Sequence, residues 1–441
     1  MIKYISERGG GMKRYISPYL IIIGSFLMLI LAGAILLLLP VSLKDNQSIS
    51  FVDSLFVSTS AVTITGLSTV NLYETFNVFG KIVIAILIQI GGLSVTTFAV
   101  FILTIIGSKL SIGSRELAKE SINVDSIKGI IKVVKNVVAI AFIFELIGTI
   151  VFTTIFMVEG NSFFNSLGLA AFHSIASYNN SGFDIFVYGN SLMHYSSNVV
   201  FNLMTVVLIV MGGLGAIVVF DVIEKKRWKK FSFHTRIVLK MTLILLLLGA
   251  ASFMVLEKNV SIIQAIFHSV TLRTAGFYTH DYSTISNATR IIMIIFMYIG
   301  GAPASTAGGI KVTAVYTLYK AGTSYIRKQE PVSYNRKIPV SYQLKALMIF
   351  MLSFVIIVIA LITLTITEKN VRTSSLLFEL ISAITNTGLT ENLTMILSTL
   401  SKIILIVLMF IGRIGIMTLI NYFVPKKEVK NIDYIDINYI I

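Results

Sequence analysis

The chain has 441 residues, of which 55% are hydrophobic and only 13% are charged, whereas about 25% of the residues of a soluble domain are charged. This composition excludes a water-soluble fold. Cysteine is absent, which excludes disulfide frameworks, thiolate metal sites and cysteine nucleophiles. The net charge of +15 does not indicate a nucleic-acid partner, because the basic residues cluster between apolar segments, as in membrane proteins.

Apolar runs of about 20 residues, long enough to cross a bilayer, recur along the chain. The first begins near Tyr19 and has no small-residue cleavage site before its end, so we expect it to remain as a membrane span. The sequence thus predicts an all-α, polytopic protein embedded in the lipid bilayer. The clearest runs are Tyr19–Pro40, Val137–Val158, Val200–Phe220, Ile237–Leu256, Leu344–Ile366 and Ile403–Phe423.

The predicted elements form four tandem repeats, each with a helix, a short re-entrant pore helix with its loop, and a second helix. Repeat 1 (1–106) has helices near 17–40, 51–62 and 77–106, and repeat 2 (107–222) near 134–158, 163–178 and 196–222. Repeat 3 (223–342) has helices near 236–256, 260–272 and 288–320, and repeat 4 (343–441) near 343–367, 373–385 and 399–424. The short helices are too brief to span a membrane, so we expect them to surround a pseudo-fourfold central pore.

Two glycine markers define the repeats. The first is the glycine of a polar turn after each short helix, with a phenylalanine nine or ten residues before it: Gly66, Gly182, Gly276 and Gly388. The second follows 24 to 30 residues later: Gly91-Gly92-Leu93, Gly212-Gly213-Leu214, Gly300-Gly301-Ala302 and Gly412-Arg413-Ile414. Four such coincidences indicate one unit repeated in one orientation.

Most basic residues fall in five clusters: the first 14 residues, Lys109–Lys135, Lys225–Lys240, Lys311–Lys345 and Lys426–Lys430. All five lie between the predicted helix–turn–helix units or at their ends. The positive-inside rule therefore places them, and both termini, in the cytoplasm. We interpret most of these residues as determinants of topology and lipid head-group contact, with a docking surface for a cytoplasmic partner as the alternative.

The polar turns have the chemistry of a cation filter. Irregular backbone at membrane depth must be buried in protein or line an aqueous cavity, and carbonyl rings can replace the hydration shell of a monovalent cation. Glycine allows the required backbone conformation, and the short helices direct the negative ends of their dipoles at the focus. The turns contain no carboxylate ring, which argues against a divalent-cation filter. The predicted ion-binding residues are Thr65, Gly66, Ser181, Gly182, Ala275, Gly276, Thr387 and Gly388; hydroxyl groups near them either bind the ion or brace the turns.

Two features break the fourfold pattern. The segment from Gly300 to Gly309 contains the pairs Gly300-Gly301 and Gly308-Gly309 and a proline, so it cannot hold a continuous helix. We predict a flexible intramembrane gate loop there, with a packed kink as the alternative. Arg413 replaces a glycine in repeat 4, and an intramembrane arginine indicates function. We interpret it as an electrostatic barrier at the gate, with a structural ion pair as the alternative.

These residues resemble the Trk/Ktr/HKT superfamily of potassium transporters, and within it the bacterial KtrB branch. The resemblance rests on the four turn glycines, the Gly300–Gly309 loop and Arg413, and it covers nearly the whole chain. It implies potassium uptake across the bacterial plasma membrane through one filter per chain, in a homodimer with two separate pores. It also implies a cytoplasmic ring of KtrA-like RCK subunits that controls opening, with nucleotide bound to that ring and no cofactor on this chain, and stimulation by sodium. The potassium-channel signature Thr-Val-Gly-Tyr-Gly is missing from the turns, so a shorter, less demanding filter is expected.

Two other classes of protein fit the sequence less well. A secondary transporter with inverted repeats would have units of alternating orientation, whereas these four all start and end at basic clusters. An enzyme would need a metal motif or an activated nucleophile, and the five histidines lie in no metal-ligand spacing. We therefore expect no enzymatic activity. The regulatory ring is expected to contact the loops Lys109–Lys135 and Lys225–Lys240 and the tail Val424–Ile441, although the tail is alternatively a dimer interface.

Overall fold

The structure is a computed structural model that describes residues 3–5, 13–15, 18–106, 130–416 and 418–419, apart from positions 188, 259 and 304. Two of the predicted docking segments therefore lie outside the described residues: most of Lys109–Lys135, and the whole tail Val424–Ile441. The loop Lys225–Lys240 is described. It contains the short 3-10 helix η3 (Trp228–Lys230) and leads into the next long helix.

Each repeat begins with a long apolar helix followed by a short one. The long helices are α1 (Pro18–Leu38), α7 (Ile130–Val158), α11 (Phe233–Leu256) and α15 (Val340–Thr367), and each contains a segment long and apolar enough to cross a membrane. The short helices are α2 (Phe51–Val62), α8 (Phe163–Tyr178), α12 (Ile262–Thr271) and α16 (Thr373–Ile384). The predicted all-α, polytopic fold is confirmed, and these eight helices lie within a few residues of their predicted positions.

The second helices of repeats 1, 2 and 4 break or end before the predicted position, whereas the break in repeat 3 falls on the segment that was predicted to be non-helical. Helix α4 (Val78–Leu93) turns by 98° into α5 (Val95–Ile105), and α9 (Val199–Leu214) turns by 95° into α10 (Ala216–Lys225). In repeat 3, α13 (Asn287–Tyr298) is separated from α14 (Val312–Ile326) by an irregular segment, and in repeat 4 α17 ends at Ile414 after starting at Thr399. The cause lies in the backbone: Ser94, Gly215 and Gly415 have φ values of 70°, 81° and 86°, which no right-handed helix allows.

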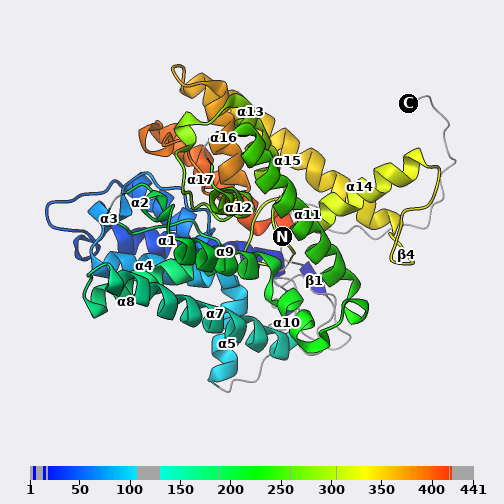
Figure 1. The fold of residues 1–441 in the computed structure, drawn as a ribbon, viewed down its shortest axis with the longest axis horizontal. Helices are drawn as coiled ribbons and strands as arrows, with labels where there is room; N and C mark the ends of the chain where they lie inside the picture. The colour runs from blue at the N-terminus through cyan, green and yellow to red at the C-terminus, as the bar shows by residue number, and fades with distance from the viewer. Residues whose placement is uncertain are drawn as a thin grey trace.

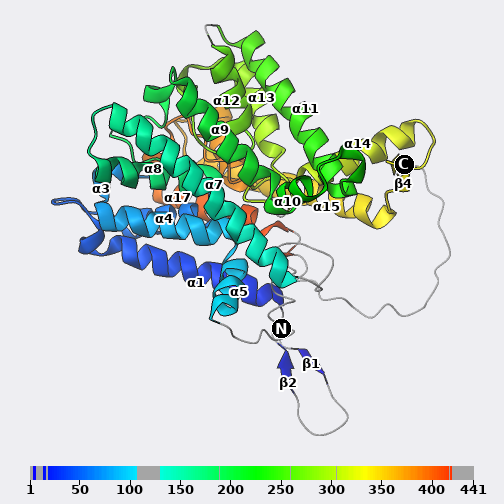
Figure 2. The same cartoon turned by 60° about the horizontal axis from the view of Figure 1, so that its bottom comes forward.

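Smaller elements connect these helices. They are α3 (Leu72–Thr75) and the 3-10 helices η1 (Pro40–Ser42), η2 (Met193–Tyr195), η4 (Tyr282–Thr284) and η5 (Thr394–Ile396). Two antiparallel pairs of strands complete the described chain: β1 (Lys3–Ile5) with β2 (Lys13–Tyr15), and β3 (Val332–Ser333) with β4 (Arg336–Lys337). Helix α14 and the β3–β4 hairpin project from one side of the helical body (Figures 1 and 2).

The four repeats close into a ring in chain order. Repeat 1 contacts repeat 2 through α4 and α8, repeat 2 contacts repeat 3 through α9 and α12, and repeat 3 contacts repeat 4 through α13 and α16. The ring closes where α17 packs on α2. In Figure 1 the helices of repeats 1 and 2 fill one half of the body, and α13, α15, α16 and α17 fill the other.

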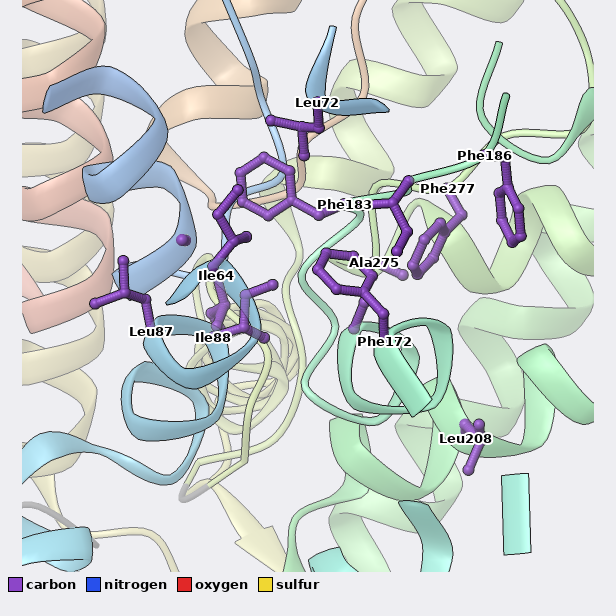
Figure 3. Packing of buried hydrophobic residues seen from close by; sticks show 14 of the residues in the cluster. Ile64, Leu72, Leu87, Ile88, Phe172, Phe183, Phe186, Leu208, Ala275 and Phe277 are labelled. Carbon is purple, nitrogen blue, oxygen red and sulfur yellow. The ribbon is translucent and has the colours of Figure 1, made fainter. Parts of the chain in front are cut away.

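Buried apolar side chains surround the turns of repeats 1 to 3. Ile64, Phe183, Ala275 and Phe277 come from the turns themselves and join one cluster with Phe172 of α8 (Figure 3). Ile64, Phe183 and Phe277 are each at most 1% exposed. The irregular backbone of the turns is therefore buried in protein, as it must be at membrane depth.

Glycines allow the long helices to approach the short ones. A β-carbon at Gly33 of α1 would lie 2.7 Å from Leu87 Cδ1 and would overlap Ser58 Oγ of α2. The Ser58 hydroxyl donates a hydrogen bond of 2.6 Å to the carbonyl of Ile30. Repeats 2 and 3 have the same arrangement, with Gly148 against Ser174 and Gly249 against Ser269. Close packing on small residues is a common basis of helix association in membranes.

This packing predicts that Gly33→Leu destabilises the protein by about 1–3 kcal/mol, the usual cost of overpacking. The thermal midpoint of the detergent-solubilised protein, followed by size-exclusion chromatography, should fall. Gly24→Leu is the matched control, because Gly24 lies on the same helix and has nothing within 4 Å of its β-position. Equal midpoints for the two variants would contradict the prediction.

Candidate functional site

The four turn glycines lie next to one another in a closed ring. A β-carbon built on each would meet the next turn: Gly66 faces Gly182, Gly182 faces Gly276, Gly276 faces Gly388, and Gly388 faces Gly66. Each would also meet the carbonyl oxygen of the residue before the next glycine, which belongs to Ser181, Ala275, Thr387 and Thr65 in turn. The structure thus brings all eight predicted turn residues together, and their order around the ring is their order in the chain. We call this arrangement the glycine ring.

The four turns share one backbone feature, a pair of positive φ angles. Each glycine has a positive φ, between 70° and 94°. The residue two positions earlier also has a positive φ, although it is not glycine: Ile64, Asn180, Thr274 and Asn386, with φ from 53° to 69°. A branched residue such as Ile64 rarely adopts this conformation, and strained residues persist only where the surroundings enforce them. This shared strain was not predicted, because sequence alone does not show which neighbours enforce it.

Side chains brace the turns from behind. In repeat 1, Thr63 Oγ1 donates to the carbonyl of Thr59 at 2.7 Å and contacts Thr65 Oγ1 at 2.8 Å. In repeat 4, Thr385 makes the equivalent contacts with Ile381 and Thr387, both at 2.7 Å. These hydroxyl groups therefore hydrogen-bond to protein. These bonds are the ones that the bracing role requires.

The segment between α13 and α14 lies against the turns, on the side where the short helices end. Gly308 N donates to Thr274 Oγ1 at 3.1 Å, and Ala302 N donates to the carbonyl of Gly213 at 3.1 Å. The two ends of the segment meet, because Gly300 N donates to the carbonyl of Ile310 at 3.0 Å. Of the four predicted gate glycines, Gly308 thus packs on the turns, while Gly300, Gly301 and Gly309 lie where the chain enters and leaves the loop.

Arg413 holds this loop. Its Nη1 donates to the carbonyl of Thr306 at 3.0 Å, and its Nη2 donates to the carbonyls of Gly91 at 2.5 Å and Gly92 at 3.0 Å. Arg413 therefore contacts the loop that was predicted to be the gate through one backbone carbonyl, that of Thr306. The alternative of an ion pair has no support among the described residues, because the partners of the guanidinium are backbone carbonyls.

A cavity of about 850 Å³ lies on the loop side of the ring. Gly92, Gly212 and Thr306 are part of its wall. Its charged lining among the described residues is entirely basic: Lys311, Arg336, Lys337, Lys345 and Arg413. Lys311 Nζ donates to the carbonyl of Ala307 at 2.6 Å. A cation that crosses the ring toward this cavity would therefore meet two positive charges bound to the loop.

Sequence reasoning missed several polar residues around the ring. Glu145 and Gln89 hydrogen-bond to Asn179, which caps α8. Glu379, fully buried in α16, accepts hydrogen bonds from Thr390 and Thr394 just beyond Gly388. Glu145 could have been identified from the sequence, because an acidic residue within an otherwise apolar run indicates function.

Comparison with known proteins identifies the class. The family model described as TrkH, cation transport protein, matches residues 7–432. The chain belongs to this family of cation transporters. It is 37% identical over 435 residues to the Ktr system potassium uptake protein B of Bacillus subtilis, covering 96% of each chain, and 34% identical over 436 residues to the potassium/sodium uptake protein NtpJ of Enterococcus hirae, again covering 96% of each.

The fold has a solved counterpart. The crystal structure of the potassium transporter TrkH from Vibrio parahaemolyticus superposes with a TM-score of 0.71 and 23% identity, covering 93% of this chain and 86% of that one. Because the chain belongs to a family of cation transporters and has several helices long and apolar enough to cross a membrane, it is a multi-pass membrane transporter and not an enzyme, as predicted.

The geometry predicts that Gly182→Ala lowers cation uptake by about tenfold or more, because the new β-carbon would lie 2.8 Å from Gly276 Cα at a positive φ. Uptake of radiolabelled rubidium by cells is the measurement. Gly168→Ala is the control, since Gly168 of α8 has nothing within 4 Å of its β-position. Similar uptake by both variants would show that the ring tolerates a side chain.

Proposed function

We propose that this chain takes up potassium across the bacterial plasma membrane and that the glycine ring is its selectivity filter. The observation that carries the proposal is the closed contact of four glycines, each beside a carbonyl oxygen of the neighbouring turn. Carbonyl oxygens suit a monovalent cation that must shed its water. The names of the relatives, a potassium uptake protein and a potassium/sodium uptake protein, support the choice of ion.

The short helices add to this preference. All four end at the turns, with Val62, Tyr178, Thr271 and Ile384 as their last residues. The C-terminal end of each helix carries about half a negative elementary charge. Four such ends around one ring favour a cation, and the bracing by threonine hydroxyls keeps the carbonyls in place.

The loop from Gly300 to Gly309 is the gate in this proposal, and Arg413 holds it in the closed position. The loop lies across the cavity side of the ring and contacts repeat 2 at Gly213 and repeat 4 at Thr385. Arg413 links it to repeat 1, because the same guanidinium binds the carbonyls of Thr306 and Gly91. The charge of Arg413 and that of Lys311 oppose the passage of a cation. Opening requires the loop and the guanidinium to move together.

The side of the molecule that holds the basic cavity is the cytoplasmic side in this proposal, in agreement with the positive-inside rule. The chain works as a homodimer under control of a ring of KtrA-like RCK subunits that binds the nucleotide. Names such as "Ktr system" support a system of several components. Helix α14 follows the loop directly and projects toward this side, so a docked ring could pull on the loop through it.

The filter is tested by Gly66→Ser. The serine side chain would crowd the carbonyl of Ser181 and disturb one quarter of the ring, so we expect weaker discrimination between potassium and sodium. The ratio of potassium to sodium uptake, measured in a bacterial strain deficient in potassium uptake, should fall roughly tenfold. An unchanged ratio in a correctly inserted variant would remove this turn from the filter.

The gate is tested by deleting Ala302–Ala307. The deletion removes the Thr306 carbonyl that Arg413 binds, so potassium flux should rise and depend less on the ring subunit. Uptake is compared with and without the co-expressed ring subunit. Flux at the wild-type level that still requires the ring would leave the segment as a packed kink.

A further inference from the structure

A carboxylate lies inside the apolar body of α7, behind the turn of repeat 2. Glu145 is 5% exposed, and α7 is one of the helices apolar enough to cross a membrane. A charged group at this depth is costly unless it is paired, and it marks a functional position more often than a packing one. Neither the glycine ring nor the gate loop includes Glu145.

Each carboxylate oxygen of Glu145 accepts a hydrogen bond from a carboxamide side chain. Asn179 Nδ2 donates to Oε1 at 3.1 Å, and Gln89 Nε2 donates to Oε2 at 3.2 Å. Asn179 Nδ2 also donates to Gln89 Oε1 at 2.9 Å. The three side chains thus form a closed triangle, in which the carboxylate is the group that accepts without donating. Gln89 belongs to α4 of repeat 1, and Asn179 is the cap between α8 and the glycine ring.

Hydrogen bonds connect this triangle of side chains to the gate loop and to Arg413 along two routes. On one side, the carbonyl of Tyr178, the residue before Asn179, accepts a hydrogen bond of 3.3 Å from Thr306 Oγ1 in the loop. The carbonyl of Thr306 in turn accepts from Arg413. On the other side, Arg413 donates to the carbonyls of Gly91 and Gly92, on the same helix as Gln89.

These contacts form one closed circuit through all four repeats. Gln89 comes from repeat 1, Glu145 and Asn179 from repeat 2, Thr306 from repeat 3, and Arg413 from repeat 4. The circuit holds one cation, Arg413, and one carboxylate, Glu145, with carbonyl and amide groups between them. The packing is tight, because a β-carbon at Gly92 would lie 2.9 Å from Asn179 Cβ.

We propose that Glu145 is a positioning residue that anchors this circuit and thereby holds the gate loop closed against the filter turn of repeat 2. The inference rests on the proposed role of the loop and Arg413 as the gate. Without the carboxylate, Asn179 and Gln89 each lose an acceptor. The end of α8 and the broken end of α4 are then held less firmly, and these two elements provide the carbonyls to which Thr306 and Arg413 bind.

The first test is Glu145→Leu, which keeps a side chain of similar size and removes both acceptors. Potassium uptake without the ring subunit should rise roughly threefold to tenfold, the range expected for energetic coupling through a network. Glu159→Leu is the matched control, because Glu159 follows α7 directly and bonds Tyr195 outside the circuit. Its uptake should remain at the wild-type level.

The second test restores the triangle in mirror image. In the double variant Gln89→Glu/Glu145→Gln, Asn179 again donates to two oxygens, and the carboxamide introduced on α7 would donate to the carboxylate introduced on α4. Uptake and its dependence on the ring should return close to wild type, which a general loss of packing would not allow. If Glu145→Leu does not reach the membrane, Glu145→Gln replaces it, since it leaves two carboxamide nitrogens facing each other, and the same double variant should reverse its effect.

Arg413→Ala separates the failure of this inference from the failure of the proposed gate. If Arg413→Ala leaves flux and ring dependence unchanged, the gate itself is wrong. If Arg413→Ala raises flux and Glu145→Leu/Arg413→Ala raises it no further, both act through one circuit, as proposed. If the two changes multiply, or if Glu145→Leu alone leaves uptake unchanged or lowers it, Glu145 does not hold the gate and the inference is overturned.

Discussion

The structure depends on the rule that a backbone carbonyl inside a membrane needs a partner. In repeats 1, 2 and 4 the second helix packs a glycine on the last carbonyl of its short helix, with Gly91 on Val62, Gly212 on Tyr178 and Gly412 on Ile384, whereas Gly300 of repeat 3 packs on Gly308 of its own loop. The second helices then break within a few residues of these glycines, which leaves helical carbonyls free. Those of α4 accept from Arg413, and those of α9 accept from the loop. The same glycine marker thus serves to pack the ring and to supply acceptors for the gate.

A ring made from one chain has one seam that no linker crosses, between repeats 4 and 1. Polar contacts close this seam at three depths. Lys402 and Asp53 form an ion pair of 2.8 Å at the start of α2, and Asn386 Nδ2 donates to Thr65 Oγ1 at 2.9 Å beside the glycine ring. Arg413 bonds to the end of α4 at the level of the loop. These contacts hold repeats 4 and 1 together where no chain segment connects them, so Arg413 contributes to ring closure as well as to the proposed gate.

The parts of the fold that depend on local chemistry could be predicted from the sequence. The long helices follow from apolar length, and the turns follow from glycine recurring at one spacing. The breaks at Ser94 and Gly215 were missed because an apolar run such as Val199–Leu214 continues without a proline, and only tertiary partners make the break favourable. The circuit around Glu145 was missed for a similar reason. Its members are far apart in the chain, and only the closed ring brings them together.

The four repeats differ from one another on the cavity side of the glycine ring, and there is a physical reason why they differ there and not at the ring itself. In the proposed filter, coordination of a cation by carbonyls from all sides requires four similar turns, and all four turns have the paired positive φ angles. One loop on the pore axis is enough to block the ion path. If all four repeats carried such a loop, all four loops would have to move at once to open the path. In the proposed gate, the single loop from repeat 3 moves together with the one arginine of repeat 4 that binds it, and no other repeat contributes a loop. The repeats therefore resemble one another at the glycine ring and differ on its cavity side, where the proposed gate would open without disturbing the proposed filter.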